Sequence, residues 1–188
     1  MGLSFSNLHV RTERPLDEAL AMRIAEILME DADVEPAADV SEADVTVCAG
    51  ENSPWVTVLA DDTEGDPEEL LRKTRALSEA LETPALAIAC FDSDFLCLNL
   101  MDVKNAIDLS VVHGNLPFEE MPHGGDPAAW RAYVKDFERF MQTLRTPSVF
   151  AEDALPDLAA ELALPAEQAF CTEEEIPEDM RVFGFTIS

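Results

Sequence analysis

The sequence predicts an α+β fold in a single domain, and three observations support that prediction. The chain has 188 residues, of which 47% are apolar, an ordinary length and share for one globular core. Apolar periodicity alternates between the strand and helix periods in the order β-α-β-β-α-β-β-β, before a helical stretch and a last strand. Two adjacent segments are apolar on nearly both faces, which is typical of strands covered on each side.

Six segments make up the first half of the chain. They are, in order, a strand at 3–11, a helix at 15–31, a loop at 32–42, strands at 44–49 and 55–60, and a helix at 66–82. The alternation slips near Asn7, which indicates a bulge in the first strand. Pro15 opens the first helix and Asp66-Pro67 opens the second, since an acid and a proline both suit a helix start.

The second half contributes three strands, a Gly- and Pro-rich loop, two helices and a closing strand. They are expected at 85–91, 95–101 and 105–112, at 113–126, at 126–144 and 156–163, and at 181–188. The strands at 85–91 and 95–101 need a cover for their second face. That cover is expected from the helix that carries a heavy apolar stripe from Trp130 to Leu144, or from another copy of the chain. A homodimer through these strands is therefore a further expectation.

The order of these elements predicts a ferredoxin-like (split βαβ) core over residues 1–115, with two helices on one face of a sheet that hairpin strands extend. Residues 116–188 are expected to form a helical extension, whose helices pack on the other face, and the closing strand. Because no low-complexity linker or internal repeat divides the sequence, we expect residues 1–188 to be one α+β domain.

A formal net charge of −27, from 39 acids and 12 Lys and Arg residues, is the extreme property of the chain. A field of that sign repels nucleic-acid phosphates and anionic membranes, so neither is expected as a partner. No apolar run approaches the roughly 20 residues that span a bilayer. The charge suits solubility or adaptation to salt, or a surface that binds a basic protein partner.

The cysteines and the known cofactor motifs restrict the chemistry further. Cys48, Cys90, Cys97 and Cys171 form no Cys-x-x-Cys pair, and three of them lie in apolar runs, where cysteine behaves as a small hydrophobic residue. A disulfide framework is not expected at this length, and a reducing cytoplasm is the expected location. Phosphate-binding Gly-rich loops, dinucleotide fingerprints and His-Glu-x-x-His do not occur, so no cofactor is expected.

The stretch Asp92-Ser93-Asp94 carries the most chemically suggestive acids. It resembles the Asp-x-Asp-x-[Thr/Val] signature of haloacid-dehalogenase-type phosphatases, in which the two acids serve as nucleophile and acid/base beside Mg²⁺. The stretch departs from that signature because Leu96 stands at the fifth position and because another strand follows. Only Lys104 and Lys135 follow as candidates for the required lysine. A hairpin turn also explains the stretch, since Asp and Ser favour turns.

A small hydrolase or a metal site would draw on six candidate residues, namely Asp61, Asp62, Asp92, Asp94, His113 and His123. In the expected sheet the strands that end at residues 60 and 91 run antiparallel. Asp61 and Asp92 would then lie about 17–20 Å apart at opposite edges, with Asp102 nearer to Asp61. Because Ca²⁺ and Mg²⁺ need oxygens that converge within about 2.6 Å, a metal site is not predicted. The spacing of the two histidines matches no zinc motif.

Four strings, SFSNLHVR, WVTVLADD, FDSDFL and VFAEDAL, together resemble a family of uncharacterised bacterial proteins over most of the chain. None of them is a catalytic motif, so the resemblance implies a small soluble bacterial protein and assigns no functional residue. Two function classes stay open. The first is a non-enzymatic protein-binding module, immunity-type (toxin-neutralising) or regulatory, whose acidic charge attracts a basic partner. The alternative is a small hydrolase or metal-dependent enzyme that uses the Asp and His residues above.

Overall fold

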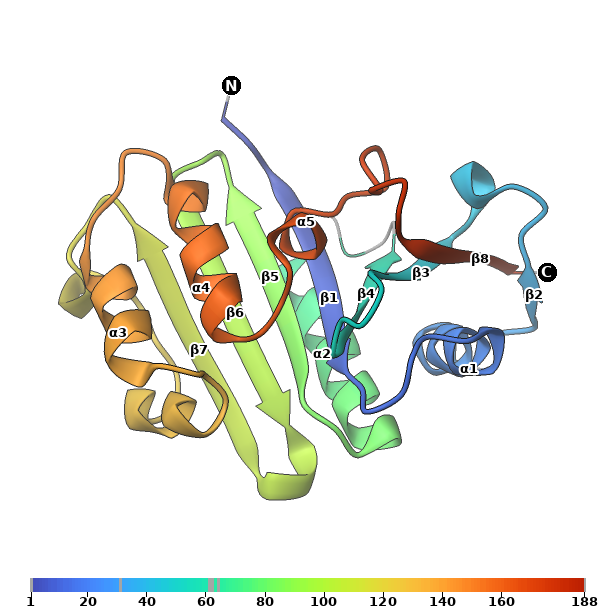
Figure 1. The fold of residues 1–188 in the computed structure, drawn as a ribbon, viewed down its shortest axis with the longest axis horizontal. Coiled ribbons are helices and arrows are strands. Elements are labelled where there is room, and N and C mark those ends of the chain that lie inside the picture. The colour runs from blue at the N-terminus through green and yellow to red at the C-terminus, as the bar shows by residue number, and fades with distance from the viewer. Residues whose placement is uncertain (1, 31, 61–62, 64, 188) are drawn as a thin grey trace.

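The computed structural model describes residues 2–30, 32–60, 63 and 65–187, and in this part of the chain eight strands form one antiparallel sheet between two helical layers (Figure 1). The strands are β1 (Phe5–Arg11), β2 (Val34–Pro36), β3 (Val45–Ala49), β4 (Trp55–Ala60), β5 (Ala85–Phe91), β6 (Phe95–Asp102), β7 (Ile107–Gly114) and β8 (Arg181–Ile187). The α-helices are α1 (Glu18–Leu28), α2 (Pro67–Leu81), α3 (Phe137–Arg145), α4 (Leu155–Glu161) and α5 (Ala166–Ala169). Short 3-10 helices are η1 (Val40–Glu42), η3 (Val103–Asn105), η4 (Phe118–Glu120), η5 (Pro127–Ala132) and η6 (Ala151–Ala154). The predicted α+β class is confirmed.

The strands lie in the order β2-β8-β3-β4-β1-β5-β6-β7, and each neighbouring pair is antiparallel. The closing strand β8 lies between β2 and β3, so the C-terminal part of the chain completes the sheet. β2 falls in the segment 32–42, which the sequence predicts to be a loop. Its three residues are too few to show a period, and its partner strand comes from the other end of the chain.

The strand β1 pairs with β5 in one unbroken register from Phe5 to Val10, so the bulge predicted near Asn7 is absent. Asn7 interrupts the apolar pattern because it is a polar residue that is fully buried. Two faces of β1 are therefore covered, and strict alternation is not required of such a strand.

Helices α1 and α2 cover one face of the sheet (Figure 1). β5 directs Ala85, Ala87 and Ala89 toward that face and its larger side chains, such as Leu86 and Ile88, toward the other. The small side chains leave room for α2 to lie close to the strand. β5 is thus apolar on both faces, with large side chains on one face and small side chains on the other.

Capping acids determine where these two helices begin. Asp66 accepts hydrogen bonds from the backbone N–H groups of Glu68 and Glu69, and α2 begins where the sequence predicts. Asp17 accepts from Leu20 N and is the N-cap of α1, so this helix begins at Glu18 and the predicted start at Pro15 is wrong.

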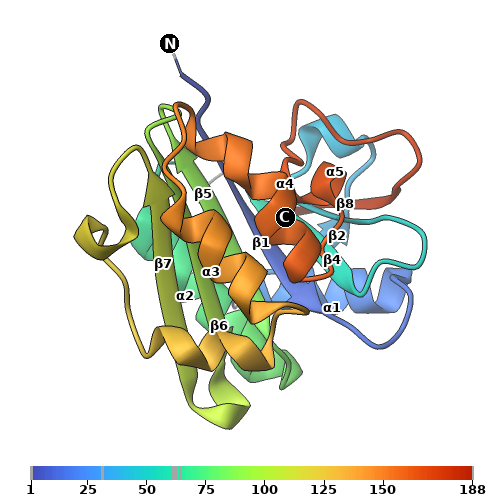
Figure 2. The same ribbon diagram turned by 60° about the vertical axis from the view of Figure 1, so that its left-hand side comes forward.

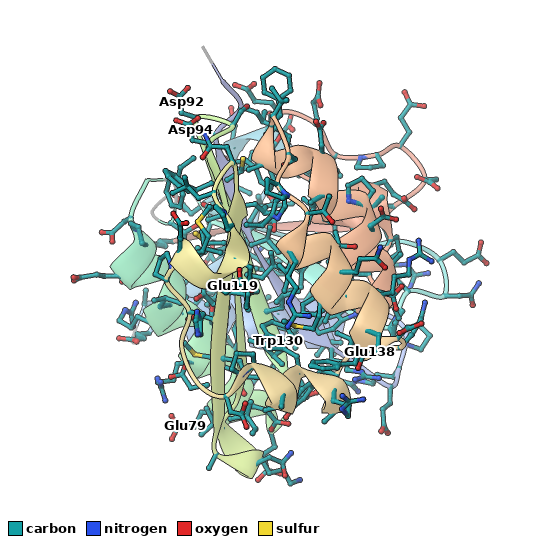
Figure 3. The ribbon with its side chains drawn as sticks, turned by 90° about the vertical axis from the view of Figure 1, so that its left-hand side faces the viewer. Glu79, Asp92, Asp94, Glu119, Trp130 and Glu138 are labelled. Atoms are coloured by element: carbon teal, nitrogen blue, oxygen red, sulfur yellow. The ribbon has the colours of Figure 1, made fainter. Side chains whose placement is uncertain are left out.

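The second face is covered by η5, α3, α4 and α5 of the same chain (Figure 2). Trp130 is fully buried with its ring 5.2 Å from that of Phe140, and Figure 3 shows it between the sheet and the helices. The predicted cover from the C-terminal helices is confirmed. Since β5 and β6 also have strand neighbours on both edges, the predicted homodimer through these strands loses its physical reason.

The helix predicted over residues 126–144 is divided into η5 and α3. Asp136 is the N-cap of α3 and accepts from Arg139 N at 3.1 Å. Between the two helices, Lys135 N donates to the carbonyl oxygen of Glu161 and Asp136 N donates to its carboxylate. Partners on α4 therefore replace the bonds that a continuous helix would have made.

Both β4 and β5 are antiparallel to β1 and hence parallel to each other. Their C-terminal ends therefore lie at the same edge of the sheet, where an edge is the side formed by the ends of the strands. Beyond β4, Ser6 Oγ donates to Thr63 O at 3.1 Å, and beyond β5, Asp92 N donates to Ser4 Oγ at 2.9 Å. The prediction that these two strands run antiparallel, with their ends at opposite edges, is wrong, whereas Asp61 itself lies outside the described residues. Asp102 lies at the other edge, beside the start of β5, and not near the end of β4. Within the described residues, none of the helices combines the length and apolar character that crossing a bilayer requires.

Candidate functional site

The stretch Asp92-Ser93-Asp94 forms the turn between β5 and β6, at the edge where β1 begins. Asp92 and Ser93 have left-handed φ values of 49° and 59°, and Asp94 N donates to Phe91 O at 2.9 Å. Two consecutive left-handed residues are characteristic of a type I′ turn, whose twist suits antiparallel strands, and Asp tolerates this conformation. The hairpin turn predicted as one explanation of this stretch is confirmed. Figure 3 shows Asp92 and Asp94 together at one end of the molecule, directed away from its body.

Ser93 fastens three segments together at this turn. Its hydroxyl accepts from Leu3 N and donates to Glu152 Oε1, each at 2.7 Å. Its backbone N–H donates to Leu3 O at 2.9 Å, and its carbonyl oxygen accepts from Ala151 N at 2.8 Å. The start of the chain, the β5–β6 turn and η6 therefore form one junction.

His113 joins the end of β7 to the loop that follows α3. Its Nδ1 donates to Leu144 O at 3.3 Å, which leaves Nε2 to accept from Ser148 Oγ at 2.8 Å. Burial lowers the pKa of His113, and the bond to Leu144 only partly opposes that shift. A neutral His113 thus holds the loop that leads to Val149 and Phe150.

The other predicted site residues have local structural partners or lie outside the described part of the chain. Asp92 Oδ1 accepts from Gly2 N at 2.8 Å. His123 Nδ1 donates to Met121 O at 3.2 Å, and its ring stacks on that of Phe118. Asp61 and Asp62 belong to the residues that the structure does not describe. In the described residues, no group of three or more His, Cys, Asp and Glu side chains is placed to hold a metal ion.

Exposed apolar side chains gather around the β5–β6 turn. In the part of the chain that the structure describes, seven large apolar side chains are exposed, and five of them are Leu3, Phe95, Leu116, Val149 and Phe150. Their exposed fractions run from 40% for Phe95 to 81% for Val149. We call these five residues the turn patch.

Hydrogen bonds and strand pairing bring the turn patch together from four segments. Leu3 is bonded to Ser93 directly, and Phe150 precedes Ala151, which is bonded to the same residue. Phe95 begins β6 and pairs with Gly114 at the end of β7, two residues before Leu116. The segments that carry the five residues therefore meet at the Ser93 junction or next to it.

Acids and hollows border the turn patch. Asp92, Asp94 and Asp153 are exposed beside it. A hollow of about 370 Å³ between α3 and α4 adjoins the patch at Ser148 and Asp153. A smaller hollow of about 210 Å³, at the start of β1 and the end of β5, lies at the same edge of the sheet. The patch is thus an apolar surface with a charged rim and room for a side chain beside it.

Burial holds several reactive side chains of the described chain in their neutral forms. It lowers the pKa of His9 to about 3. Burial and a hydrogen bond to Asp102 raise the pKa of Tyr133 to about 12. Burial raises the pKa of the Cys90 thiol and of the Cys97 thiol to about 11. Such values oppose proton transfer or thiolate chemistry near neutral pH at these four residues.

A cavity of about 660 Å³ lies at the opposite edge of the sheet, between the β1–α1 connection, the β3–β4 turn and the start of β8. Its charged lining is Arg14, Arg181, Glu13, Glu51 and Asp179. The two signs are mixed, so the lining selects neither an anionic nor a cationic ligand.

Sequence reasoning missed the residues of the turn patch. Val149 and Phe150 lie in the loop after Pro147 and belong to no helix or strand period, so no pattern in the sequence shows that they are exposed. The roles of Ser93 and Glu152 carry no signal either, because 59 positions separate the two residues.

Comparisons of this chain with protein-family models, with curated proteins and with solved structures find no match.

Proposed function

We propose that this protein is a non-enzymatic binding module that docks a basic protein through the turn patch. The observation that carries the proposal is the gathering of five exposed apolar side chains at one end of a strongly acidic molecule. Single exposed apolar residues are normal on a protein surface. A contiguous apolar patch with a polar rim is typical of an interaction site.

Charge complementarity identifies the class of partner. Asp92, Asp94 and Asp153 border the patch, and the whole chain carries a net charge of −27. Such a field accelerates encounter with a cationic protein and disfavours acidic partners. The partner we propose presents an apolar side chain surrounded by Lys or Arg. If that partner is an enzyme, binding would make this chain an immunity-type or regulatory protein.

Preorganisation of the patch favours binding. The Ser93 junction fixes Leu3 and the segment before Ala151, and the bond between His113 and Ser148 fixes the start of the same loop. Side chains that are ordered before association lose less conformational entropy on binding. The hollow of about 370 Å³ beside the patch offers space for an anchoring side chain of the partner.

The finer fold and the cellular location belong to the same proposal. The strand order β3-β4-β1-β5, with α1 and α2 on one face, supports a ferredoxin-like (split βαβ) core over residues 1–115. Four cysteines without a disulfide support a reducing cytoplasm. The bacterial origin rests on the resemblance of the four short strings to a family of uncharacterised proteins.

Two double variants with the same loss of exposed apolar residues test the docking surface. Val149→Ser/Phe150→Ser changes the turn patch, whereas Val40→Ser/Ile187→Ser changes two exposed apolar residues elsewhere. Each immobilised protein is incubated with a lysate of the native host at low salt and eluted with rising NaCl. We expect wild type and V40S/I187S to retain the same basic protein, and V149S/F150S to bind it at least about tenfold more weakly.

A third variant, Asp92→Asn/Asp94→Asn, tests the contribution of charge and keeps an oxygen acceptor for Gly2 N. Its complex should elute at a lower NaCl concentration than that of wild type, because exposed charges act over a distance that salt shortens. Equal retention by wild type and V149S/F150S contradicts the proposal. The proposal is also contradicted if the wild-type protein retains no protein from the lysate, or if the protein that it retains is acidic.

A further inference from the structure

Cys48 and Cys171 lie side by side in the core although 123 positions separate them in the sequence. Their Sγ atoms are 3.8 Å apart, both thiols are free, and both residues are buried. They pack with Leu59 and Met180 in a small apolar cluster of their own. A disulfide bond is about 2.05 Å long, so the two sulfurs are about 1.8 Å too far apart to be bonded.

The sheet and a buried amide position the two thiols. Cys48 lies in β3, between β4 and β8. The segment that carries Cys171 is anchored by Asn7, whose Nδ2 donates to the carbonyl oxygens of Ala169 and Cys171 at 2.9 and 3.0 Å. Because both backbones are held, rotation of the side chains is the main motion that would close the gap.

The two thiols differ in acidity. The hydrogen bond between the two Sγ atoms lowers the pKa of Cys171. The same bond, together with burial, raises the pKa of Cys48. Since the thiolate is the nucleophile in thiol oxidation, the lowered pKa favours Cys171 as the first sulfur to react, with Cys48 as the second.

We propose that Cys48 and Cys171 form an oxidation site at which hydrogen peroxide converts the two thiols into an internal disulfide. The Cys171 thiolate attacks one peroxide oxygen, and the O–O bond breaks to release hydroxide and leave a sulfenic acid. Cys48 then loses its proton, its sulfur attacks the Cys171 sulfur, and the S–O bond breaks to release a second hydroxide. The two thiol protons turn both hydroxides into water, so two electrons pass from the thiols to one peroxide.

The product fastens the segment that follows α5 to β3 of the sheet. Cys171 precedes the segment 172–180, which contains neither helix nor strand and leads into β8. The new bond closes a loop of 123 positions, and long loops restrict the unfolded chain most. We expect the melting temperature of the oxidised protein to be about 5–10 °C above that of the reduced protein.

The experiment uses the full chain with Cys90→Ser/Cys97→Ser, which leaves the proposed pair as its only thiols. The reduced protein is treated with hydrogen peroxide, its remaining thiols are alkylated, and its mass and disulfide-linked peptides are determined. We expect the loss of two hydrogen atoms, no alkylation, and a peptide that joins Cys48 to Cys171. Dithiothreitol should restore both thiols and the lower melting temperature.

A matched variant that adds Cys171→Ser to this background should form no internal link and show no change in melting temperature. Three results would overturn the proposal. The first is a product in which Cys171 carries oxygen without a link to Cys48. The second is a pair of thiols that stay reduced in the folded protein under conditions that oxidise them in urea, and the third is a disulfide between two molecules in place of the internal bond.

Discussion

His9 lies at the centre of a buried chain of hydrogen bonds that joins the sheet to the C-terminal segment. Gln168 Nε2 donates to Thr57 Oγ1 at 3.0 Å, and Thr57 Oγ1 is 3.1 Å from His9 Nδ1. His9 Nε2 is 2.8 Å from Asn7 Oδ1. Because the amide nitrogen of Asn7 donates elsewhere, its oxygen accepts from the His9 Nε2–H group. A neutral ring then accepts at Nδ1 from the Thr57 hydroxyl, and the directions of all these bonds agree.

This network makes stability depend on pH. Burial lowers the pKa of His9 from its ordinary 6.5 to about 3. Between those two values the unfolded chain binds the proton and the native chain does not, so stability falls as the pH falls. The contribution of His9 is complete above pH 6.5 and decreases by about 1.4 kcal/mol for each pH unit below it.

The variant His9→Gln removes the titrating ring and keeps an amide that can donate to Asn7. Urea unfolding of both proteins at about pH 7 and about pH 5 measures the effect. We expect wild type to lose about 2 kcal/mol more than H9Q between the two pH values. The acids and His113 are common to both proteins, so their titration cancels in the comparison. Equal losses in the two proteins would contradict a neutral buried His9.

At the scale of elements, Glu161 links α4 to the start of α3. Its side chain is 7% exposed, its carbonyl oxygen accepts from Lys135 N at 2.8 Å, and its carboxylate accepts from Asp136 N at 2.9 Å. The same carboxylate is 3.4 Å from Arg139 Nε. The break between η5 and α3 thus has its hydrogen-bond partners on another helix.

Removal of this carboxylate should loosen the helical cover. We expect Glu161→Ala to lower the free energy of unfolding by about 2–3 kcal/mol, because a buried N–H group loses its acceptor and packing is lost. Glu138→Ala is the matched control, since the Glu138 side chain is 79% exposed and its ion pair with Arg131 contributes little. Urea unfolding measures both variants. A loss for E161A no larger than that for E138A would show that the carboxylate does not fasten α3.

The sequence predicted helices, strands and turns correctly where they depend on interactions between residues close in the chain. The cap at Asp66, the strand periods and the Asp92–Asp94 turn each depend on residues within a few positions, and the structure confirms them. The break before α3 was predictable only in part, because the Asp136 cap is local but the acceptor of Asp136 N lies 25 positions away. β2 was missed for the same reason, since it pairs with β8.

The candidate site was predictable only in part. Three of the predicted residues lie at one edge of the sheet, close to the turn patch. Asp92 and Asp94 border the patch, and His113 holds the loop that carries part of it. The patch itself combines residues from four segments, and its existence depends on which side chains the fold leaves exposed. Exposure of Val149 follows from the packing of α3 and η6, which no period in the sequence expresses.

At the scale of the whole molecule, the net charge of −27 opposes compactness. A domain of this length has a radius of gyration of about 16 Å. The screening length is about 30 Å at 0.01 M salt and about 8 Å at 0.15 M, so most acids repel one another only at low salt. We therefore expect the melting temperature to rise with NaCl, and most of the rise to occur below about 0.15 M.

Two matched variants identify repulsion as the cause of that rise. Glu174→Gln/Glu178→Gln removes two exposed acids from a segment without bases, whereas Glu174→Asp/Glu178→Asp keeps both charges. At about 0.01 M salt E174Q/E178Q should melt at a higher temperature than wild type, and E174D/E178D should not. The difference should vanish near 0.5 M NaCl, where the screening length is only a few Å. A rise that continues in proportion to salt, or that is equal in all three proteins, would instead indicate a general effect of salt on apolar burial.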